Sequence, residues 1–351
     1  MPQTPSLPPR FGALVRLGDG AEGGAWQALD ADAGRRVVLK RVAQARVAQV
    51  RAAFRLLRTV SSPHLPVVHE LLSDAGGDLW LVTGFVEGRP LTAGPVATEQ
   101  ALVEAAAIAH ALAAIHEAGT HHGDLSAGNV LVTPAGGVVL TDFGQIGCLG
   151  CGTPGFLAPE VLAGGGGPGG DVFALGCLLC LRLFGAVPWA SPAAVVDALR
   201  RGPAAALERV GELAEAARVT VPPGVRALLV HLLHPDARAR PADLRPLVTH
   251  LRRLAAGLGD RSKDAVSGDR LAGPGDRSMA AVSGDRLTGP GDRSAEDVSG
   301  DRSGLLAPTW WVPARWPYRG GGLTEVVAGL VASGRPRLVA VAGPAGAGRG
   351  R

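Results

Sequence analysis

Three oxygen-bearing side chains, in a fixed order along the chain, could carry chemistry. Asp124 and Asn129 lie five residues apart in the stretch HHGDLSAGN (residues 121–129), and Asp142 follows a short apolar segment. A carboxylate such as Asp124 can accept the proton of an attacking hydroxyl, while Asn129 and Asp142 can hold a magnesium ion that bridges nucleotide phosphates. Hard cations prefer such oxygen ligands. The pattern therefore predicts phosphoryl transfer.

Two segments nearer the N-terminus could position a nucleotide. LGDGAEGGA (residues 17–25) contains the spacing G-x-G-x-x-G at Gly18, Gly20 and Gly23, whose backbone can lie close to phosphates without an intervening side chain. Alone this signal is weak, because the chain contains 51 glycines. Its value rises because the next strand-like segment, RVVLK (residues 36–40), ends in a lysine.

In this order, these motifs resemble those of the protein kinase family. HGDLSAGN is similar to the catalytic loop H-R-D-L-x-x-x-N, TDFG to the metal motif D-F-G, and RVVLK to V-A-I-K. The resemblance implies an enzyme that uses ATP and Mg²⁺. It implies that Asp124 is the base, that Lys40 contacts the α- and β-phosphates, and that Asn129 and Asp142 bind the metal.

The resemblance also implies an adenine pocket. LWLVTGFVEG (residues 79–88) is similar to the strand and hinge between kinase lobes, so that Thr83 would flank adenine and the backbone of residues 84–86 would hydrogen-bond it. Ala25 and Val38 replace the usual Val and Ala, which leaves the pocket apolar. The residues expected to bind the nucleotide are Leu17, Gly18, Gly20, Gly23, Ala25, Lys40, Thr83 and Val86.

A helix predicted over residues 43–60 lacks the carboxylate that kinases pair with the strand lysine. Ala53 stands at that position, and no Asp or Glu occurs between Lys40 and Glu70. Lys40 is therefore expected to be held by the nucleotide or by Asp142, and turnover should suffer more than binding. An alternative is a pseudokinase, a scaffold that binds nucleotide without transferring phosphate.

The segment after Asp142 bears on regulation. Gly123 replaces the Arg that in regulated kinases reads a phosphate, and residues 145–152 contain no Ser, Thr or Tyr. Control by phosphorylation of this segment is therefore not expected.

GTPGFLAPE (residues 152–160) bears on the substrate. It is similar to the family's G-T-P-x-Y-x-A-P-E segment and implies protein substrates with Ser or Thr, although Ser126 replaces the usual Lys. A small-molecule phosphotransferase is a second alternative, since HGDLSAGN also resembles the antibiotic-kinase loop. The GTPGFLAPE segment argues against it.

The fold implied by the resemblance is α+β and bilobal, with a small β-rich N-lobe and a large helical C-lobe. Glu160 should pair with Arg240, and Asp171, at the start of an apolar helix, should hold the catalytic-loop backbone. A helix is predicted over residues 99–118, with His116 as a packed core histidine rather than a catalytic one.

Composition limits the partners and the compartment. The 351 residues carry a net charge of +4 with scattered basic residues, and aromatic residues make up 4%, which argues against a nucleic-acid partner. No apolar run is long enough to predict a membrane span, and the N-terminus lacks the apolar core of a signal peptide. We therefore expect a cytoplasmic protein; the oligomeric state is left open.

Four cysteines form two C-x-x-C pairs, Cys148/Cys151 and Cys177/Cys180. A zinc site is formally possible. For Cys177 and Cys180, on the expected core helix, two small buried thiols are the favoured interpretation. A redox switch at Cys148 and Cys151 is a weaker alternative.

The composition of the two ends of the chain differs from that of its middle. Residues 1–10 are predicted to be a disordered tail, residues 11–256 the kinase-like domain, and residues 257–306 a flexible linker of sixteen-residue repeats. Residues 307–351 end in GPAGAGRGR, which resembles the start of a P-loop ATPase domain with Arg349 in place of Lys. This part is either a truncated domain or a decayed remnant.

Overall fold

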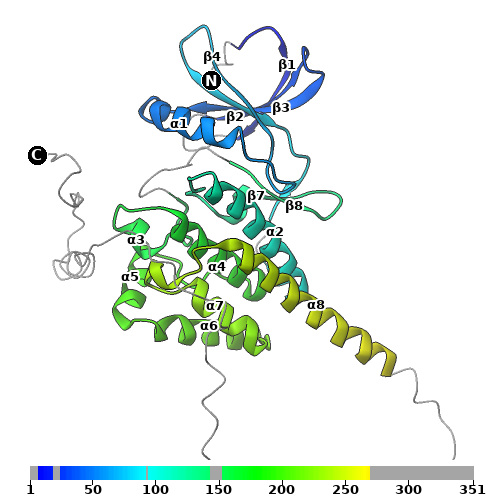
Figure 1. Cartoon of the computed structure of the whole chain (residues 1–351), viewed down its shortest axis with the longest axis vertical. Helices are drawn as coiled ribbons and strands as arrows, with labels where there is room; N and C mark the ends of the chain where they lie inside the picture. The colour runs from blue at the N-terminus through cyan, green and yellow to red at the C-terminus, as the bar shows by residue number, and fades with distance from the viewer. Residues whose placement is uncertain (1–6, 19–23, 92–93, 143–151, 269–351) are drawn as a thin grey trace, which may run out of the picture.

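A computed structural model of the chain describes residues 7–18, 24–91, 94–142 and 152–268. These residues form two lobes, with a β-sheet lobe above a helical lobe in Figure 1. The predicted α+β fold, with a β-rich N-terminal part and a helical C-terminal part, is confirmed.

The N-lobe is built on an antiparallel five-stranded sheet. Its strand order is β1 (Phe11–Gly18), β2 (Ala25–Asp30), β3 (Arg35–Val42), β5 (Leu79–Gly84) and β4 (Val68–Ser73). Side chains of a strand alternate between the two faces of the sheet. On β3, Val37 and Leu39 are fully buried in a cluster with Trp80 and Val82, whereas Val38 and Lys40 point to the other face.

The N-lobe helix is shorter than the predicted range of 43–60. Residues Gln44–Arg46 form a 3₁₀ turn, and α1 runs from Val47 to Leu57. Its apolar side buries Val50, Ala53 and Leu57. Short 3₁₀ turns are common at helix termini, where the first backbone groups lack partners within the helix.

The C-lobe contains seven α-helices among the described residues and a small sheet beside the lobe junction. The helices are α2 (Thr98–Glu117), α3 (Pro159–Leu162), α4 (Pro168–Phe184), α5 (Pro192–Arg201), α6 (Ala204–Ala217), α7 (Pro223–Leu232) and α8 (Leu244–Gly268). The sheet has the order β6 (Arg89–Pro90), β7 (Val130–Val132) and β8 (Val138–Leu140).

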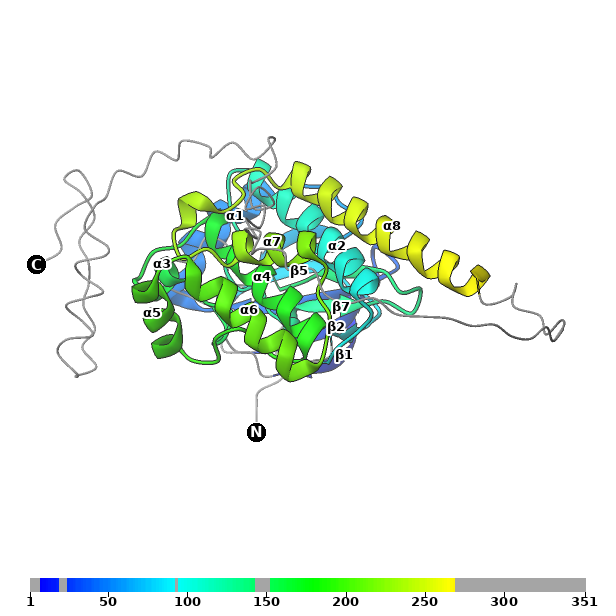
Figure 2. The same cartoon turned by 90° about the horizontal axis from the view of Figure 1, so that it is seen from below.

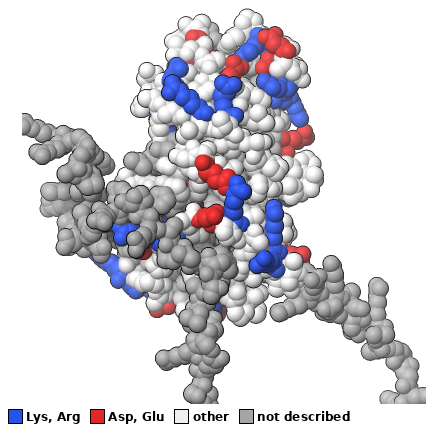
Figure 3. Space-filling model, viewed as in Figure 1, with Lys and Arg blue, Asp and Glu red and all other residues white. Residues whose placement is uncertain are grey.

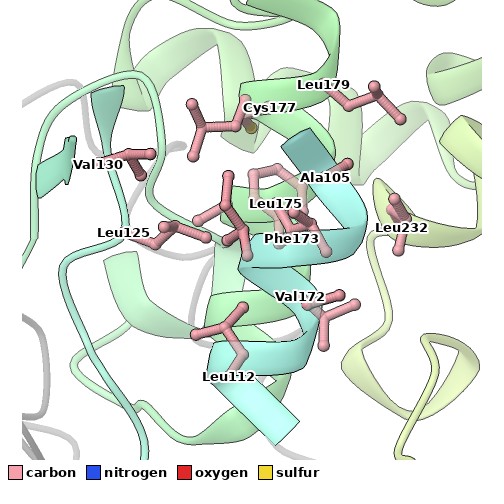
Figure 4. Close-up of a cluster of buried hydrophobic side chains, with 14 of the residues drawn as sticks. Ala105, Leu112, Leu125, Val130, Val172, Phe173, Leu175, Cys177, Leu179 and Leu232 are labelled. Atoms are coloured by element: carbon pink, nitrogen blue, oxygen red, sulfur yellow. The ribbon is translucent and has the colours of Figure 1, made fainter. Parts of the chain in front are cut away.

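Helix α4 is the centre of this lobe. Every residue from Asp171 to Phe184 is buried, as expected for a helix that is apolar all round. Figure 4 shows Phe173 and Leu175 of α4 in one cluster with Leu125, within the predicted catalytic loop, and Val130, directly after it. The loop is therefore anchored by side chains that pack against the core.

Cys177 and Cys180 are buried free thiols on α4, as the favoured interpretation predicted. Burial raises the pKa of both thiols, so they are held in the unreactive protonated form. Cys148 and Cys151 lie outside the described residues. In the described part of the chain, His, Cys, Asp and Glu side chains form no group of three that could hold a metal ion.

Two boundary predictions are corrected. Residues 7–10 belong to the fold rather than to a tail, because Leu7 packs against the buried cluster of the sheet and the side chain of Arg10 pairs with Glu70. At the other end α8 continues to Gly268, so residues 257–268 are helical although their composition predicted a linker. Figure 2 shows α8 projecting beyond the rest of the helical lobe. The remaining repeats and the P-loop-like end lie outside the described residues.

Candidate active site

A hairpin brings the two predicted metal ligands to the same place. Strand β7 pairs antiparallel with β8, with Val130 opposite Leu140. The residues that flank this pair are therefore neighbours: the backbone oxygen of Asn129 accepts hydrogen bonds from the amide and the hydroxyl of Thr141, at 2.8 and 3.1 Å. Asp142 follows directly, so Asn129 and Asp142 lie at one end of the hairpin.

Asn129 is oriented by the predicted base. Its side-chain nitrogen donates to the backbone oxygen of Asp124 at 2.7 Å and to Asp124 Oδ2 at 3.1 Å. Because the nitrogen faces Asp124, the oxygen Oδ1 of Asn129 is the atom that can bind a cation. Together with the carboxylate of Asp142, it supplies the hard oxygen donors that suit Mg²⁺.

The second oxygen of Asp124 is held by the segment predicted to dock peptides. Thr153 Oγ1 donates to Asp124 Oδ1 at 2.7 Å. Gly152 permits this approach, because it adopts a φ of +134° and a Cβ there would lie 3.2 Å from the backbone oxygen of Gly123. This contact is not predicted by the sequence, in which residues 152–160 point to the substrate; the T-P-G triplet next to a required glycine was the available signal.

His122 ties the loop to the hairpin. Its Nε2 donates to the backbone oxygen of Thr141 at 2.9 Å, and its Nδ1 accepts from the amide of Asp124 at 3.3 Å. A carbonyl only accepts and an amide only donates, so this pattern describes the neutral ring with its proton on Nε2. The side chain is fully buried, which makes its role one of positioning Asp124.

Asp171 holds the loop from below, as predicted. Its carboxylate accepts from the amides of His122 and Gly123 at 2.8 and 2.9 Å, and from His116 Nε2 at 2.8 Å. Burial raises the pKa of Asp171, but the hydrogen bond and the charge of His116, together with contributions from His122 and the amide of Gly123, bring the pKa below its ordinary value. His116 is thus a core histidine with a specific partner, which sequence reasoning did not identify.

Lys40 shares a face of the N-lobe sheet with other predicted nucleotide contacts. It lies opposite Ala25 on β2 and opposite Leu81 on β5, while Val38 lies opposite Thr83. Directly opposed residues of antiparallel strands project to the same face. The register therefore gathers Ala25, Lys40 and Thr83 on the face that is turned away from the buried cluster of Val37 and Leu39.

The ammonium group of Lys40 forms an ion pair with Asp142, which joins the N-lobe to the hairpin. This is one of the two partners expected in the absence of a helix carboxylate. Ala53 is buried in the same hydrophobic cluster as Val42, two residues from Lys40. Asp142 has a φ of +68°, a left-handed conformation that is uncommon for residues other than glycine and that often occurs at functional sites.

Two of the three backbone amides predicted to lie near adenine are hydrogen-bonded within the chain. The amide of Gly84 donates to the oxygen of Val67 at 2.8 Å, and the amide of Phe85 donates to the oxygen of Arg36 at 3.2 Å. Of the three amides expected near adenine, that of Val86 is therefore the one left to bind it within the described chain.

Two predicted glycine contacts cannot be placed, because Gly20 and Gly23 lie outside the described residues. Gly18, at the end of β1, lies opposite Ala25. Leu17 beside it is 48% exposed, which is high for a large apolar side chain.

A buried ion pair that the sequence did not predict joins α2 to α4. Arg182 Nε and one terminal nitrogen donate to the two carboxylate oxygens of Glu104 at 2.7 and 3.0 Å. The expected pair of Glu160 with Arg240 is present, at 2.6 and 3.0 Å. Arg182 joins two helices of the C-lobe, and Arg240 also donates to the backbone oxygens of Gly169 and His234, so both pairs hold parts of the fold together.

The comparison with known proteins agrees with this geometry. The sequence model of the protein kinase domain matches residues 11–251. Serine/threonine-protein kinase PknA of Mycobacterium tuberculosis is 29% identical over 222 residues, which cover 56% of this chain and 51% of PknA. PknJ of the same species is 33% identical over 159 residues, 40% of this chain and 27% of PknJ.

A third relative, PknK of Mycobacterium tuberculosis, is 34% identical over 143 residues, which cover 36% of this chain and 13% of PknK. The chain thus spans about half or less of the length of these relatives. Across the described residues, no helix combines the length and the apolar character needed to cross a membrane.

Proposed function

Because this chain belongs to the protein kinase domain family, we propose that it transfers the γ-phosphate of ATP to serine or threonine hydroxyls of a protein substrate. The observation that carries the proposal is the meeting of Asp124, Asn129 and Asp142 at one end of the β7–β8 hairpin, with Lys40 joined to them from the other lobe.

Asp124 takes the role of the base. Its two oxygens are oriented by Thr153 and by Asn129, so that the carboxylate is fixed before a substrate arrives. A substrate hydroxyl that replaced the Thr153 hydroxyl at Asp124 Oδ1 would be placed to give up its proton as phosphate is transferred. Preorganised geometry of this kind lowers the entropic part of the barrier.

ATP and Mg²⁺ are the proposed cofactors. When bound, Mg²⁺ neutralises the charge that develops on the phosphates. Asn129 Oδ1 and the carboxylate of Asp142 supply its ligands, Lys40 lies against the phosphates, and the amide of Val86 binds adenine. Asp142 would pair with Lys40 and also bind the metal. In most kinases these two roles belong to two different carboxylates.

We further propose that activity does not require phosphorylation of the segment after Asp142. Gly123 has no side chain to read a phosphate, and its amide is already used by Asp171. A cytoplasmic location and the absence of a nucleic-acid partner stay predictions from composition.

A nucleotide-binding pseudokinase is the second candidate. The buried Ala53 in place of a carboxylate and the ion pair of Lys40 with Asp142 favour it. A small-molecule phosphotransferase is disfavoured, because the hydrogen bond from Thr153 couples the peptide-docking segment to Asp124.

Incubation of the purified full chain with labelled ATP and Mg²⁺ tests the proposal. Labelled phosphoserine or phosphothreonine on a generic protein substrate or on the chain itself is expected, and it should disappear in Asp124→Asn. The matched control is Asp197→Asn, which removes an exposed carboxylate on α5 and should leave transfer unchanged. Tight ATP binding without transfer in the wild-type chain would select the pseudokinase.

A further inference from the structure

Helix α1 carries a basic stripe on its outer side, made of Arg51, Arg55 and Arg58. These residues follow one another at intervals of four and three, which places them on one face of a helix. All three are exposed. With a rise of about 1.5 Å per residue, their Cα atoms are spaced about 6 and 4.5 Å along the axis. Figure 3 shows basic side chains over α1 on the upper lobe.

The charge of this stripe is not compensated within the described chain. Other arginines of the N-lobe pair with carboxylates: Arg10 with Glu70, Arg36 with Glu87 and Arg41 with Asp78. By contrast, no carboxylate of the described residues forms an ion pair with the stripe, and residues 41–69 contain neither Asp nor Glu. Like charges at this spacing repel one another and destabilise a helix.

The buried side of α1 lies away from the stripe. Val50, Ala53 and Leu57 are buried, whereas the three arginines are exposed. Leu56 is 40% exposed, but it stands one, two and five positions from these arginines and so lies off their face of the helix. The outer face of α1 therefore carries three positive charges within two turns of helix.

We propose that the basic stripe of α1 is a docking surface for an acidic protein segment whose carboxylates are spaced about 6 Å apart. Carboxylates at positions i and i+4 of a helix, or i and i+2 of an extended strand, have about this spacing. Guanidinium groups match carboxylates in a planar, two-point geometry.

The shape and size of the surface favour a peptide over other polyanions. Membranes and nucleic acids spread their charge over a surface much wider than two turns of a helix. Single-stranded nucleic acid also binds through exposed aromatic rings. The one aromatic residue of α1, Phe54, is partly buried, and the guanidinium of Arg58 lies 5.8 Å from its ring centre.

The test uses the full chain and a fluorescent synthetic peptide that carries Glu at positions i, i+4 and i+7. The key variant is Arg51→Gln/Arg55→Gln/Arg58→Gln, which keeps helix propensity. The matched control, Arg200→Gln/Arg252→Gln/Arg253→Gln, removes the same charge from exposed positions of α5 and α8. Each exposed ion pair contributes roughly two- to threefold, so the key variant should lose about tenfold in affinity and the control less than twofold.

A triple variant that fails to fold is recognised by its circular dichroism melting curve. Arg55→Glu then serves as the second variant: it should bind the acidic peptide more weakly, and a peptide whose central Glu is replaced by Lys should restore binding. Equal losses in the key and control variants would overturn the proposal, because binding would then follow net charge. Tighter binding of a phosphoserine peptide, an oligonucleotide or anionic vesicles through the same arginines would also overturn it.

Discussion

The Glu160–Arg240 pair allows a quantitative test of what holds the segment beside the active site. The Arg240 side chain is fully buried and the Glu160 side chain is 19% exposed. Arg240 also donates to the backbone oxygens of Gly169 and His234 at 2.8 and 2.7 Å. In Glu160→Gln these bonds stay, but the buried guanidinium loses its counter-charge. Stranding a buried charge costs about 3–5 kcal/mol, and we expect the lower end because Gln still accepts one hydrogen bond.

The chain offers a matched control for this experiment. Arg245 and Glu117 form another two-point pair, but their side chains are 73% and 46% exposed. Glu117→Gln should therefore change the stability little, because solvent screens an exposed pair. For a domain of this size, 1 kcal/mol lowers the Tm by about 2–4 °C, so thermal unfolding should show a drop of about 6–12 °C for Glu160→Gln and little change for Glu117→Gln.

The outcome that refutes this reasoning is an equal Tm for the two variants. A second comparison isolates the charge: Glu160→Gln/Arg240→Met should recover part of the lost stability, because a buried pair can often be replaced by apolar groups at little cost. A double variant that is less stable than Glu160→Gln would show that hydrogen bonds, rather than the stranded charge, dominate.

Three further predictions concern the active site. Ala53→Glu places a carboxylate on the inner side of α1, where it would compete with Asp142 for Lys40. We therefore expect a higher phosphate-transfer rate and little change in ATP affinity, which steady-state kinetics with ATP titration would check. Gly152→Ala should slow transfer and lower the Tm by about 2–12 °C, since positive-φ strain costs about 1–3 kcal/mol. Gly202→Ala, at another positive φ with free space around it, separates this strain from the close contacts that a Cβ at Gly152 would make with Leu157 and Gly123. Asp171 has a lowered pKa in the folded chain, so the ionised carboxylate stabilises the fold at pH values above the ordinary carboxyl pKa. This contribution is lost as the pH falls through the ordinary pKa and then through the lowered one. The Tm measured against pH should therefore fall more gently at acid pH in Asp171→Asn than in the wild type.

The parts of the site that sequence could predict are those set by local order along the chain. Asp124, Asn129 and Asp142 lie on one loop and one hairpin, so their motifs also fix their proximity. The lack of any Asp or Glu between Lys40 and Glu70 left two partners for Lys40, the nucleotide or Asp142, and the structure has the ion pair with Asp142.

The contacts that sequence reasoning missed join residues far apart in the chain. His116 bonds to Asp171 across 55 positions, and Arg182 to Glu104 across 78. Such pairs depend on how α2 and α4 cross. The pattern of apolar residues within one helix does not predict this crossing. Helix α8 shows the converse: residues 257–268 have a polar, glycine-containing composition, yet they are helical because extending an existing helix is far easier than starting one.

The position of Lys40 links the candidate active site to the arrangement of the two lobes. Its ion pair is with Asp142 of the C-lobe rather than with α1, whose inner side presents only apolar residues such as Val50 and Leu57. A change in how the lobes sit would therefore move Lys40 relative to Asp142, whereas a shift of α1 alone would reach Lys40 only through packing. For this reason we expect occupation of the basic stripe to stabilise the N-lobe against unfolding while leaving ATP affinity nearly unchanged; a large change in ATP affinity would mean that α1 positions Lys40 despite the missing carboxylate.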